Sequence, residues 1–587
     1  MLTRLQVRNF KRFEQAAIEL GQAVVLIGPN NSGKTTALQA LALWDIGVRR
    51  WLEKRQGKTS PEKRPGVTIN RRDLISIPTP DANLLWRDLH VRSVEQVWVE
   101  KDGRRQRKPK TTNVRIDVVV EGVTQGKSWF CGLEFDYANE ESFYCRPLRI
   151  TNGERPERMP VPPQAADMRV AFLPPMSGLA AVEPVAEPGR INVLIGEGRT
   201  AEVLRNLCYQ VYPPLGPPGA WDELVGRIRA LFGVELLAPN YIAERGEITM
   251  EYKERTGTRL DLSSSGRGLQ QTLLLLAHLY ANPQTVLLLD EPDAHLEILR
   301  QRQTYNLLTD VATKQGSQII AASHSEVVLN EAADRDVVVA FVGKPHRIDD
   351  RGSQVLKSLK EIGFEDYYQA EQTGWVLYVE GSTGLAVLQA FAGTLGHDAA
   401  KHLERPFVRY IGNDPREAQR HFFGLREAKR DLLGVALFDR LLSGLPDDFS
   451  AKGLRGLEWA RREIENYLCM EEALLAYARH EQEDNLFGQA EADRRREAMS
   501  SAITEVGDAL RTLRKRDPWS VDTKVTDDFL DPLFEKYFDG LGLPNLLRKS
   551  DYHLLARLVP KDKIDPEVAQ KLDAITEVAQ RAKPLRD

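Results

Sequence analysis

The chain has 587 residues, enough for about three or four domains of ordinary size. Its formal net charge is −4, which excludes a globally basic nucleic-acid-binding protein and leaves room only for local contacts with nucleic acid. No apolar run reaches the roughly 18 residues of a membrane helix, and the first residues lack a signal-peptide pattern. We therefore expect a cytoplasmic protein without a membrane partner. The four scattered cysteines indicate neither a disulfide framework nor a zinc site.

The first 20 residues alternate in polarity, which predicts an antiparallel edge hairpin that leads into an apolar strand at 23–27. The spacing G-x-x-x-x-G-K-[ST] follows that strand, from Gly28 to Thr35, and precedes a helix. Glycines let backbone N–H groups close on phosphates, the lysine reaches the β and γ oxygens, and the threonine hydroxyl ligates Mg²⁺. The expected ATP-binding residues are Gly28, Pro29, Asn30, Asn31, Ser32, Gly33, Lys34, Thr35 and Thr36.

This opening carries a specific resemblance. The stretch RNFKRFEQAAIELGQAVVLIGPNNSGKTT resembles the start of the ABC-type ATPases of the RecF, SMC and OLD (overcoming lysogenization defect) group. Two later pieces, DEPDAHLE and SHSEVVLNEA, resemble OLD proteins. The resemblance implies an ABC-type ATPase core formed by residues 1–45 and 168–345.

Residues 46–167 leave this core and are predicted to form a basic, β-rich insertion. A turn at KDGRRQRKPK (101–110) separates two candidate strands, VEQVWVE and VRIDVVVEG. A basic loop can contact a phosphate backbone without reading bases, but ordinary surface charge on a solvated loop explains the pattern equally well. Residues 183–236 are predicted to be a mostly helical insertion, which in the resembling families forms an arm or a dimerisation element.

The apolar strand at 286–289 ends in two adjacent carboxylates, Asp290 and Glu291. Charge at the end of a buried parallel strand is costly unless a cation or a proton transfer uses it. We predict that Asp290 holds Mg²⁺ through water and that Glu291 polarises the water that attacks the γ-phosphate of ATP. His324 ends the next apolar strand, at 318–324, where parallel sheets place ligands, so we interpret it as a γ-phosphate switch.

The turn SSSGRGLQQ opens an apolar helix, and a Ser-Gly turn at a helix N-terminus is an anion site. The chain already has its own phosphate loop. ABC-type ATPases resolve this redundancy by pairing head to tail, so that the signature turn of one subunit caps the γ-phosphate held by the other. By resemblance, Ser265, Gly266 and Gly268 have this role, although the usual Gly-Gly has become Gly-Arg-Gly. A homodimer or a higher oligomer is expected.

A second α/β pattern begins near residue 366. Strand GWVLYVEG carries Glu380 at its end, strand PFVRYIG follows a helix, and strand GVALFDR carries Asp439. The stretch WARREIENYLCMEEALL is predicted to open a helix that contains Glu463 and Glu465. Acids at the carboxyl ends of adjacent parallel strands can share a divalent metal, as in two-metal nucleases.

This half resembles the Toprim domain that follows the ATPase in OLD proteins. The resemblance implies a Toprim-like domain over 366–475 and a helical region, 476–587, that completes it. It assigns Glu380, Asp439 and Glu465 as metal ligands and Lys549 as a catalytic residue.

Two acids of the Toprim pattern are missing. Gly384 stands four residues after Glu380, where a second acid belongs, and Leu441 stands where Asp-x-Asp would have its second aspartate. A divalent cation needs carboxylate charge or substrate phosphate in place of its water, so this loss weakens the predicted metal site.

The predicted fold is therefore α/β, with an ABC/RecF/SMC-type P-loop ATPase domain followed by a Toprim-like parallel domain. We expect an ATP-gated, metal-dependent endonuclease acting on double-stranded DNA in bacterial anti-phage defence or DNA processing, with ATP and Mg²⁺ as cofactors and Mn²⁺ as an alternative at the Toprim-like site. One alternative is an ATPase sensor whose degenerate Toprim module signals to a partner protein. A RecF/SMC-like repair ATPase is disfavoured because no heptad coiled coil separates the ATPase halves.

Overall fold

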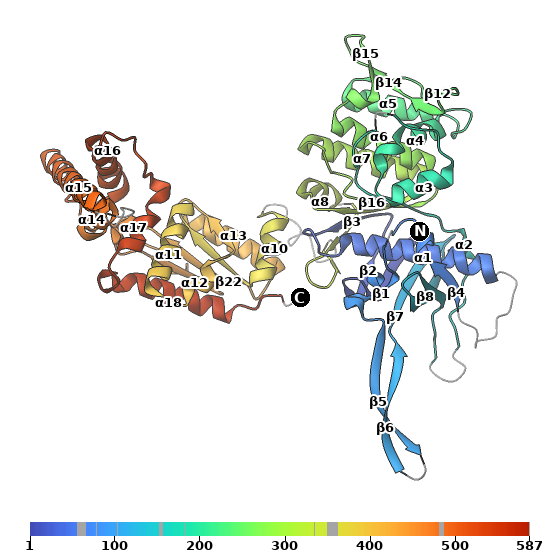
Figure 1. Ribbon diagram of the computed structural model, residues 1–587, viewed down its shortest axis with the longest axis horizontal. Coiled ribbons are helices and arrows are strands. Elements are labelled where there is room, and N and C mark those ends of the chain that lie inside the picture. Colours follow the sequence, from blue (N-terminus) through green and yellow to red (C-terminus); the bar gives the residue numbers. More distant parts are fainter. Residues whose placement is uncertain are drawn as a thin grey trace. The chain divides into compact units, whose positions relative to one another are not determined.

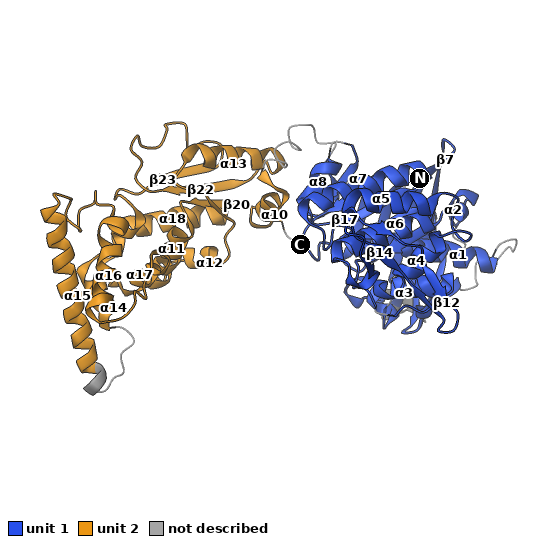
Figure 2. Ribbon diagram, turned by 90° about the horizontal axis from the view of Figure 1, so that it is seen from above, with its two compact units in different colours: residues 1–356 blue, residues 357–587 orange. Residues whose placement is uncertain are grey.

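Two compact units, residues 1–356 and 357–587, make up the chain (Figure 2). The computed structural model describes residues 1–55, 66–77, 79–101, 104–151, 157–180, 182–333, 335–348, 362–479 and 486–585. Among the helices in these ranges, none combines the length and apolarity that crossing a membrane requires.

The central sheet of unit 1 has the strand order β10-β16-β17-β3-β18-β19, and all its pairs are parallel except the last. Its strands are β3 (Ala23–Ile27), β10 (Val170–Leu173), β16 (Val286–Asp290), β17 (Gln318–Ser323), β18 (Val337–Ala340) and β19 (His346–Arg347). The three apolar runs recognised in the sequence are β3, β16 and β17. These strands are buried almost throughout because both faces of the sheet are covered. Their carboxyl ends therefore meet at one edge.

A second, antiparallel sheet in unit 1 has the order β2-β1-β7-β8-β9-β4. Its strands are β1 (Leu2–Phe10), β2 (Phe13–Glu19), β4 (Val67–Asn70), β7 (Arg115–Thr124), β8 (Lys127–Asn139) and β9 (Ser142–Pro147). The predicted N-terminal hairpin is β1–β2, and residues 46–167 supply the other strands. That segment thus completes a sheet begun by the N-terminus and shares its hydrophobic core.

Helix α1 (Lys34–Arg55) packs against strands of both sheets (Figure 1). Its buried residues include Leu38, Ala40, Leu43 and Trp44, which lie on more than one side of the helix. A helix that is apolar around its circumference is stable only when it is enclosed, and here the two sheets enclose it.

The turn predicted at 101–110 is wrong. Residues Arg104–Asn113 form β6, which pairs antiparallel with β5 (Arg92–Lys101), and residues 102–103 lie outside the described part of the chain. The two strands form a ribbon of their own, which pairs with none of the other strands in the described ranges. Such a ribbon needs no alternating apolar face, so hydrophobic periodicity gave no signal for β6.

The other face of the central sheet is covered by helices and small sheets. The helices of unit 1 after α1 are α2 (Pro163–Asp167), α3 (Pro188–Gly196), α4 (Leu204–Val211), α5 (Ala220–Phe232), α6 (Arg267–Ala281), α7 (Ile298–Gln315) and α8 (Glu326–Ala332). The small sheets are β11-β14-β15 and β12-β13, from β11 (Glu235–Leu236), β12 (Asn240–Ile242), β13 (Glu247–Thr249), β14 (Glu251–Lys253) and β15 (Arg259–Asp261). Helices α3, α4 and α5 occupy the predicted helical insertion.

Unit 2 is built on a parallel sheet with the order β21-β20-β22-β23. Its strands are β20 (Trp375–Val379), β21 (Val408–Tyr410), β22 (Leu433–Phe438) and β23 (Leu454–Glu458). The helices are α10 (Phe364–Thr373), α11 (Ser382–Leu395), α12 (Ala399–Leu403), α13 (Pro415–Ala428), α14 (Glu471–Arg479), α15 (Leu486–Thr512), α16 (Asp531–Gly540), α17 (His553–Leu558) and α18 (Pro566–Arg581). One apolar core joins one face of this sheet to the C-terminal helices.

Candidate functional site

The phosphate loop of unit 1 connects the end of β3 to the start of α1. Asn31 and Gly33 have positive φ angles of 62° and 105°, and a side chain at Gly28 would lie 2.9 Å from the carbonyl oxygen of Phe341. Only a glycine-rich sequence closes this turn without strain. The loop lines a cavity of about 270 Å³, whose walls are Arg12, Asn30, Asn31, Ser32, Gly33, Lys34, Thr35, Thr36 and Glu291.

Lys34 is 5% exposed, and its ammonium donates hydrogen bonds to the carbonyl oxygens of Gly28, at 2.6 Å, and Pro29, at 2.7 Å. Burial lowers the pKa of Lys34, although the carboxylates of Glu291 and Asp290 act in the opposite direction. A buried ammonium whose hydrogen bonds go to neutral carbonyl oxygens gains from an anionic ligand. ATP phosphate fits this requirement.

The residues predicted to hold Mg²⁺ also meet. The Thr35 hydroxyl lies 3.0 Å from Asp290 Oδ2, and burial raises the pKa of Asp290 to about 6. The buried Ser32 hydroxyl beside them makes no hydrogen bond within the described residues. Hydroxyl and carboxylate oxygens are the ligands that Mg²⁺ prefers, and a cation there would favour the ionised form of Asp290. These side chains therefore fit a nucleotide–magnesium group.

Glu291 and His324 lie together at the same edge of the sheet. Glu291 Oε1 is 3.8 Å from His324 Nδ1, and both side chains are partly exposed, at 35% and 54%. Glu291 has a positive φ of 48°, and its backbone N–H donates to the Ala322 carbonyl oxygen at 2.9 Å. A glutamate in this strained conformation is typical of functional positions, because surrounding structure must maintain it. The arrangement can position a water for attack on a phosphate.

Arg12 is a wall residue of the nucleotide cavity that our sequence analysis missed. It lies in the tight β1–β2 connection, where Lys11 has a φ of 47°. A guanidinium facing a phosphate loop can pair with phosphate oxygens. In the sequence, Arg12 is visible only as part of a basic turn between two strands. That pattern does not indicate that the turn folds beside the phosphate loop.

The turn at 265–268, which the sequence predicts to be a signature turn, lies elsewhere in unit 1. The Ser265 hydroxyl donates to the Leu262 carbonyl oxygen at 2.7 Å, and Gly266 caps the start of α6. Ser265, Gly266 and Gly268 line a separate cavity of about 530 Å³ together with His295 and other residues. Within the described residues, this cavity shares no wall residue with the phosphate-loop cavity. The turn therefore does not contribute to the walls of its own chain's nucleotide cavity.

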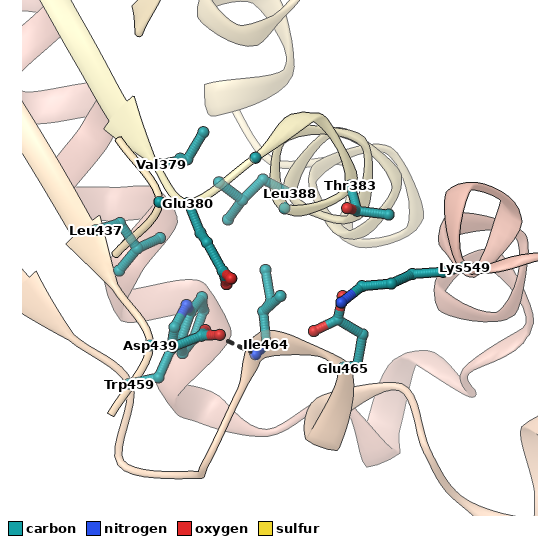
Figure 3. Close-up of a pocket in the computed structure, with 13 residues that line it drawn as sticks. Val379, Glu380, Thr383, Leu388, Leu437, Asp439, Trp459, Ile464, Glu465 and Lys549 are labelled. Atoms are coloured by element: carbon teal, nitrogen blue, oxygen red, sulfur yellow. Dashed lines mark hydrogen bonds between the residues drawn. The ribbon is translucent and has the colours of Figure 1, made fainter. Parts of the chain in front are cut away.

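In unit 2 the structure brings the predicted metal-site residues into one cavity of about 180 Å³ (Figure 3). Glu380 follows β20 and Asp439 follows the adjacent parallel strand β22, so both lie at the same sheet edge. Glu465 and Lys549 enter from the C-terminal half. Lys549 extends toward Glu465 in Figure 3.

Glu463 belongs to this cluster, and the metal-ligand prediction omitted it. Carboxylate oxygens of Asp439, Glu463 and Glu465 all lie within 4.8 Å of one another. The predicted helix here is wrong at its start, because Ile464–Tyr467 is a 3₁₀ turn with Glu463 as its N-cap. The Thr526 backbone N–H, 63 residues away, donates to Glu463 Oε1 at 2.5 Å. A contact at that separation leaves no local sequence signal.

The electrostatics of the cluster are those of crowded, buried acids. Burial raises the pKa of Asp439 to about 9, and the neighbouring carboxylate of Glu380 adds to the rise. Burial and then the charge of Glu463 raise the pKa of Glu465 to about 7. The Ile464 backbone N–H donates to Asp439 Oδ1 at 3.1 Å and fixes its direction. A divalent cation would relieve this repulsion, so the donor set fits a metal ion.

The two missing acids can also be located. A Cβ at Gly384 would have no atom within 4 Å, so the position faces open space on the wall of the cavity. The Leu441 backbone N–H donates to Glu458 Oε1 at 2.6 Å. The absence of an acid at Gly384 thus leaves room on the wall of the cavity. At Leu441, Glu458 of β23 lies beside the backbone.

Comparison with known proteins identifies the class of unit 1. A family model described as "AAA domain, putative AbiEii toxin, Type IV TA system" matches residues 217–330, and one described as "AAA ATPase domain" matches residues 1–44. These segments contain the phosphate loop, the signature turn and the Asp290–Glu291 pair. The two matched segments are thus similar to AAA ATPase domains, and the fold of unit 1 is α/β, as the sequence predicted.

Individual relatives match over shorter stretches. The chain is 32% identical over 111 residues to the oligopeptide transport ATP-binding protein AppD of Bacillus subtilis (strain 168), covering 19% of this chain and 30% of AppD. It is 49% identical over 43 residues to the OLD nuclease of Thermus scotoductus (strain ATCC 700910 / SA-01), covering 7% of this chain and 8% of the nuclease. The matched stretches therefore span less than a third of either relative.

Solved structures similar to the chain include SMC head domains. The SMC head domain from Thermotoga maritima shares 16% identity with a TM-score of 0.29, covering 59% of this chain and 98% of that one. The Smc head domain with an extended coiled coil bound to the C-terminal domain of ScpA, derived from Pyrococcus furiosus, shares 13% identity with a TM-score of 0.33, covering 62% and 99%.

Proposed function

We propose that the chain is an ATP-gated, metal-dependent endonuclease that cleaves double-stranded DNA, in the manner of OLD nucleases, and that it works as a homodimer. The observation that carries the proposal is the cavity of unit 2, where carboxylates from separate segments converge beside one lysine. Because ATPase activity belongs to unit 1, this cavity gives the chain a second centre for phosphate chemistry. The resemblance to OLD proteins favours a role in anti-phage defence.

The polar side chains of the cavity, with Glu463 beside them, have definable tasks. Glu380, Asp439, Glu463 and Glu465 would hold a divalent cation, Mg²⁺ or Mn²⁺, which supplies a Lewis acid to a phosphodiester. The Ile464 N–H keeps one Asp439 oxygen in place. The Lys549 ammonium supplies positive charge toward the non-bridging oxygens of a bound phosphate.

The homodimer follows from the separation of the two cavities in unit 1. If two copies paired head to tail, the turn at 265–268 of each copy would cover the phosphate loop of the other. Each nucleotide would then be bound by residues of both copies. ATP bound between two copies would then stabilise the pair, and hydrolysis through Glu291 would release it. In this scheme the state of the nucleotide gates the nuclease.

The experiment is plasmid nicking by the purified full chain, with ATP and either Mg²⁺ or Mn²⁺. We expect slow nicking that Mn²⁺ accelerates, because two acids of the Toprim pattern are missing and Mn²⁺ is less strict in its ligand geometry. Asp439→Asn should abolish nicking while ATP hydrolysis continues. Glu404→Gln, which alters an exposed acid of unit 2, is the matched control. Nicking that persists in Asp439→Asn would refute the assignment of the cavity.

Gly384 and Leu441 favour a second function, an ATPase sensor whose Toprim-like half no longer cuts and instead docks a partner protein. The two proposals differ in cells. Cellular protection against phage that survives Asp439→Asn but is lost in Lys34→Ala would indicate the sensor. Protection lost in both variants would indicate the nuclease.

A further inference from the structure

No residue of the β5–β6 ribbon is among the described wall residues of the phosphate-loop cavity. Its ten-residue strands extend away from the antiparallel sheet (Figure 1). At the usual rise per residue, the ribbon is about 30 Å long. An isolated two-stranded ribbon is marginally stable in water, so its length indicates a use outside the fold.

The ribbon is basic in a chain that is acidic. Strands β5 and β6 together contain seven basic and two acidic residues, whereas the whole chain has a net charge of −4. The register places Glu95 opposite Lys110 and Glu100 opposite Arg105. The remaining basic residues of β6, Arg104, Arg107 and Lys108, stand opposite residues that are not acidic. The ribbon therefore carries surplus positive charge along one strand.

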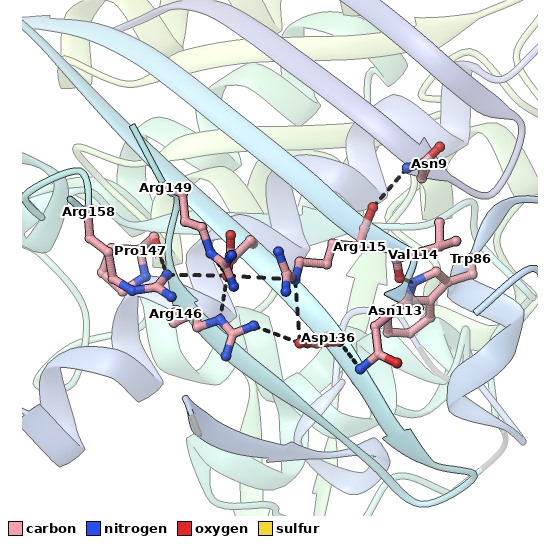
Figure 4. Close-up of polar contacts among 11 residues, drawn as sticks. Asn9, Trp86, Asn113, Val114, Arg115, Asp136, Arg146, Pro147, Arg149 and Arg158 are labelled. Atoms are coloured by element: carbon pink, nitrogen blue, oxygen red, sulfur yellow. Dashed lines mark hydrogen bonds and ion pairs between the residues drawn. The ribbon is translucent and has the colours of Figure 1, made fainter. Parts of the chain in front are cut away.

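The base of the ribbon is held firmly to the antiparallel sheet. The Trp86 indole N–H donates to the Val114 carbonyl oxygen at 2.7 Å, and the Asn9 amide donates to that of Arg115 at 3.0 Å. The Asn113 amide donates to Asp136 Oδ1 at 2.8 Å (Figure 4). These bonds fix where the ribbon leaves the sheet.

Four arginines gather at that base; we call them the arginine cluster: Arg115, Arg146, Arg149 and Arg158. They surround two carboxylates, Glu134 and Asp136, whose side chains are 2% and 10% exposed, whereas the arginines are 14–30% exposed (Figure 4). The carboxylates are thus the more deeply buried members, and the guanidiniums are nearer to solvent. Four guanidiniums thus face Glu134 and Asp136, and the Asp117 carboxylate is close enough to interact with Arg115 and Glu134.

Arg149 is the least satisfied member of the cluster. Its Nε is buried without a hydrogen bond within the described residues and lies 3.7 Å from Glu134 Oε1. Arg146 and Arg158 already donate to that same oxygen. Burial and the neighbouring guanidiniums lower the pKa of Arg149. A surplus guanidinium in this position gains from an added anion.

We infer that the β5–β6 ribbon and the arginine cluster form a docking surface for B-form duplex DNA, with the ribbon in the major groove and the arginines on the phosphate backbone. The basic residues of the ribbon and the cluster would pair with phosphates on either side of the groove, so most of the affinity would not depend on the base sequence. The inference rests on the proposed function, because that function makes double-stranded DNA the substrate that the chain has to bind. It adds to unit 1 a binding surface whose residues belong to neither of the two candidate catalytic centres.

The shape of the ribbon selects among polyanions. The major groove of B-form DNA is about 12 Å wide and admits a two-stranded β-ribbon. The major groove of an A-form RNA duplex is deep and narrow, and side chains do not reach into it. An acidic protein surface offers charge but no groove. DNA duplex is therefore the partner that matches both the charge and the geometry.

The test is fluorescence anisotropy of a 30-base-pair DNA duplex with the full chain, in EDTA and in the Asp439→Asn background, so that no cleavage occurs. The ribbon variant is Arg104→Gln with Arg107→Gln, and the cluster variant is Arg149→Gln. The control, Arg190→Gln with Arg229→Gln, removes two exposed charges of the helical segment. ATP hydrolysis reports that every variant is folded.

We expect the ribbon variant to bind about tenfold more weakly and to lower the slope of log Kd against log salt by about two, since each phosphate contact contributes about 0.9. The cluster variant should lower the slope by about one, and the control should match the parent. An RNA duplex of the same sequence should bind more weakly than DNA.

Unchanged binding in both the ribbon and the cluster variants would overturn the inference. Equal binding of the RNA duplex, or equal competition by polyglutamate, would overturn the choice of DNA. Ribbon-dependent DNA binding in a parent chain that cuts no plasmid supports the inference and refutes only the nuclease. Plasmid nicking that continues at the parent rate in the folded ribbon variant, with undiminished affinity, refutes only the inference.

Discussion

The nucleotide site of unit 1 and the carboxylate cluster of unit 2 both lie at the carboxyl edge of a parallel sheet, but they balance charge differently. In unit 1 a buried lysine lies among carboxylates, and glycine-rich backbone offers N–H groups. In unit 2 carboxylates crowd together, and the pKa values of Asp439, Glu463 and Glu465 all rise. The first site is ready for an anion, whereas the second needs a cation to complete it.

The largest effect is expected from substitutions in the nucleotide site of unit 1. Lys34→Ala removes the buried cation that faces the phosphates, so ATP binding should fall about a hundredfold or more and hydrolysis should be lost. Glu291→Gln should leave ATP bound but slow hydrolysis by about a hundredfold or more, because only the water-activating carboxylate is gone. Binding of a fluorescent ATP analogue and phosphate release measure the two effects separately.

Lys314→Ala, at an exposed position near the end of α7, is the control for Lys34→Ala. ATP hydrolysis at the parent rate in Glu291→Gln would show that another group activates the water. Such a result would turn attention to His324, which lies 3.8 Å from Glu291.

The second prediction concerns pH and the metal-free cluster. Glu465 has a folded-state pKa of about 7, above its ordinary 4.5, so the folded state holds its proton more tightly than the unfolded chain. The free energy of unfolding of the metal-free protein should therefore fall as pH rises from about 4.5 to 7, and Asp439 should extend that fall toward pH 9. Mg²⁺ should raise the melting temperature of unit 2 at pH 8.5 more than at pH 6.

Asp439→Asn sharpens that prediction, because it removes one charge of the crowded group. The variant should melt higher than the parent at pH 8.5 without metal, and it should lose the increase that Mg²⁺ causes. Asp448→Asn, at an exposed position of the same unit, should behave like the parent. A fall in melting temperature for Asp439→Asn at pH 8.5 would show that the carboxylates do not repel one another.

The third prediction tests whether the uncapped nucleotide site is completed by a second copy. Light scattering of Glu291→Gln should show ATP raising the mass toward that of a dimer. Ser265→Arg in the same background should weaken the ATP-dependent dimer about tenfold, because a bulky cation would occupy the turn. ATP binding by the single chain should persist, since Ser265 lies outside the phosphate-loop cavity. A mass that ATP leaves unchanged would contradict the composite site.

Much of the parallel sheet of each unit could be predicted from the sequence, for a physical reason. Parallel strands buried on both faces are continuous apolar runs in the sequence, as in β3, β16 and β20. Where an acid follows such a run, as Glu380 follows β20, it lies at the ligand-binding edge. Asp290, Glu380 and Asp439 were found in this way. The phosphate loop was found because its spacing is set by backbone geometry within eight residues.

The features that could not be predicted from the sequence depend mainly on contacts between distant segments. Glu463 joins the cluster because a backbone N–H of Thr526 fixes it, and Arg12 reaches the nucleotide cavity because its hairpin folds beside the phosphate loop. The sequence predicts a turn where β6 lies, because the residues of β6 are polar apart from a proline and show no apolar periodicity. Arg149 stands out only when the guanidiniums that share Glu134 with it are located in space.

The smallest expected effect comes from adding charge to the second site. Gly384 lies in the first turn of α11 with open space where a Cβ would be, so Gly384→Asp should fit without a clash. An acid near a helix N-terminus is favoured by about 0.3–1 kcal/mol, which offsets part of its repulsion from Glu380. Metal affinity, measured by calorimetry with Mn²⁺, should rise several-fold, because a hard cation gains a carboxylate ligand. Gly384→Asn has nearly the same shape without the charge and should leave affinity unchanged. An equal gain in both variants would mean that helix stability, and not a new ligand, had strengthened the site.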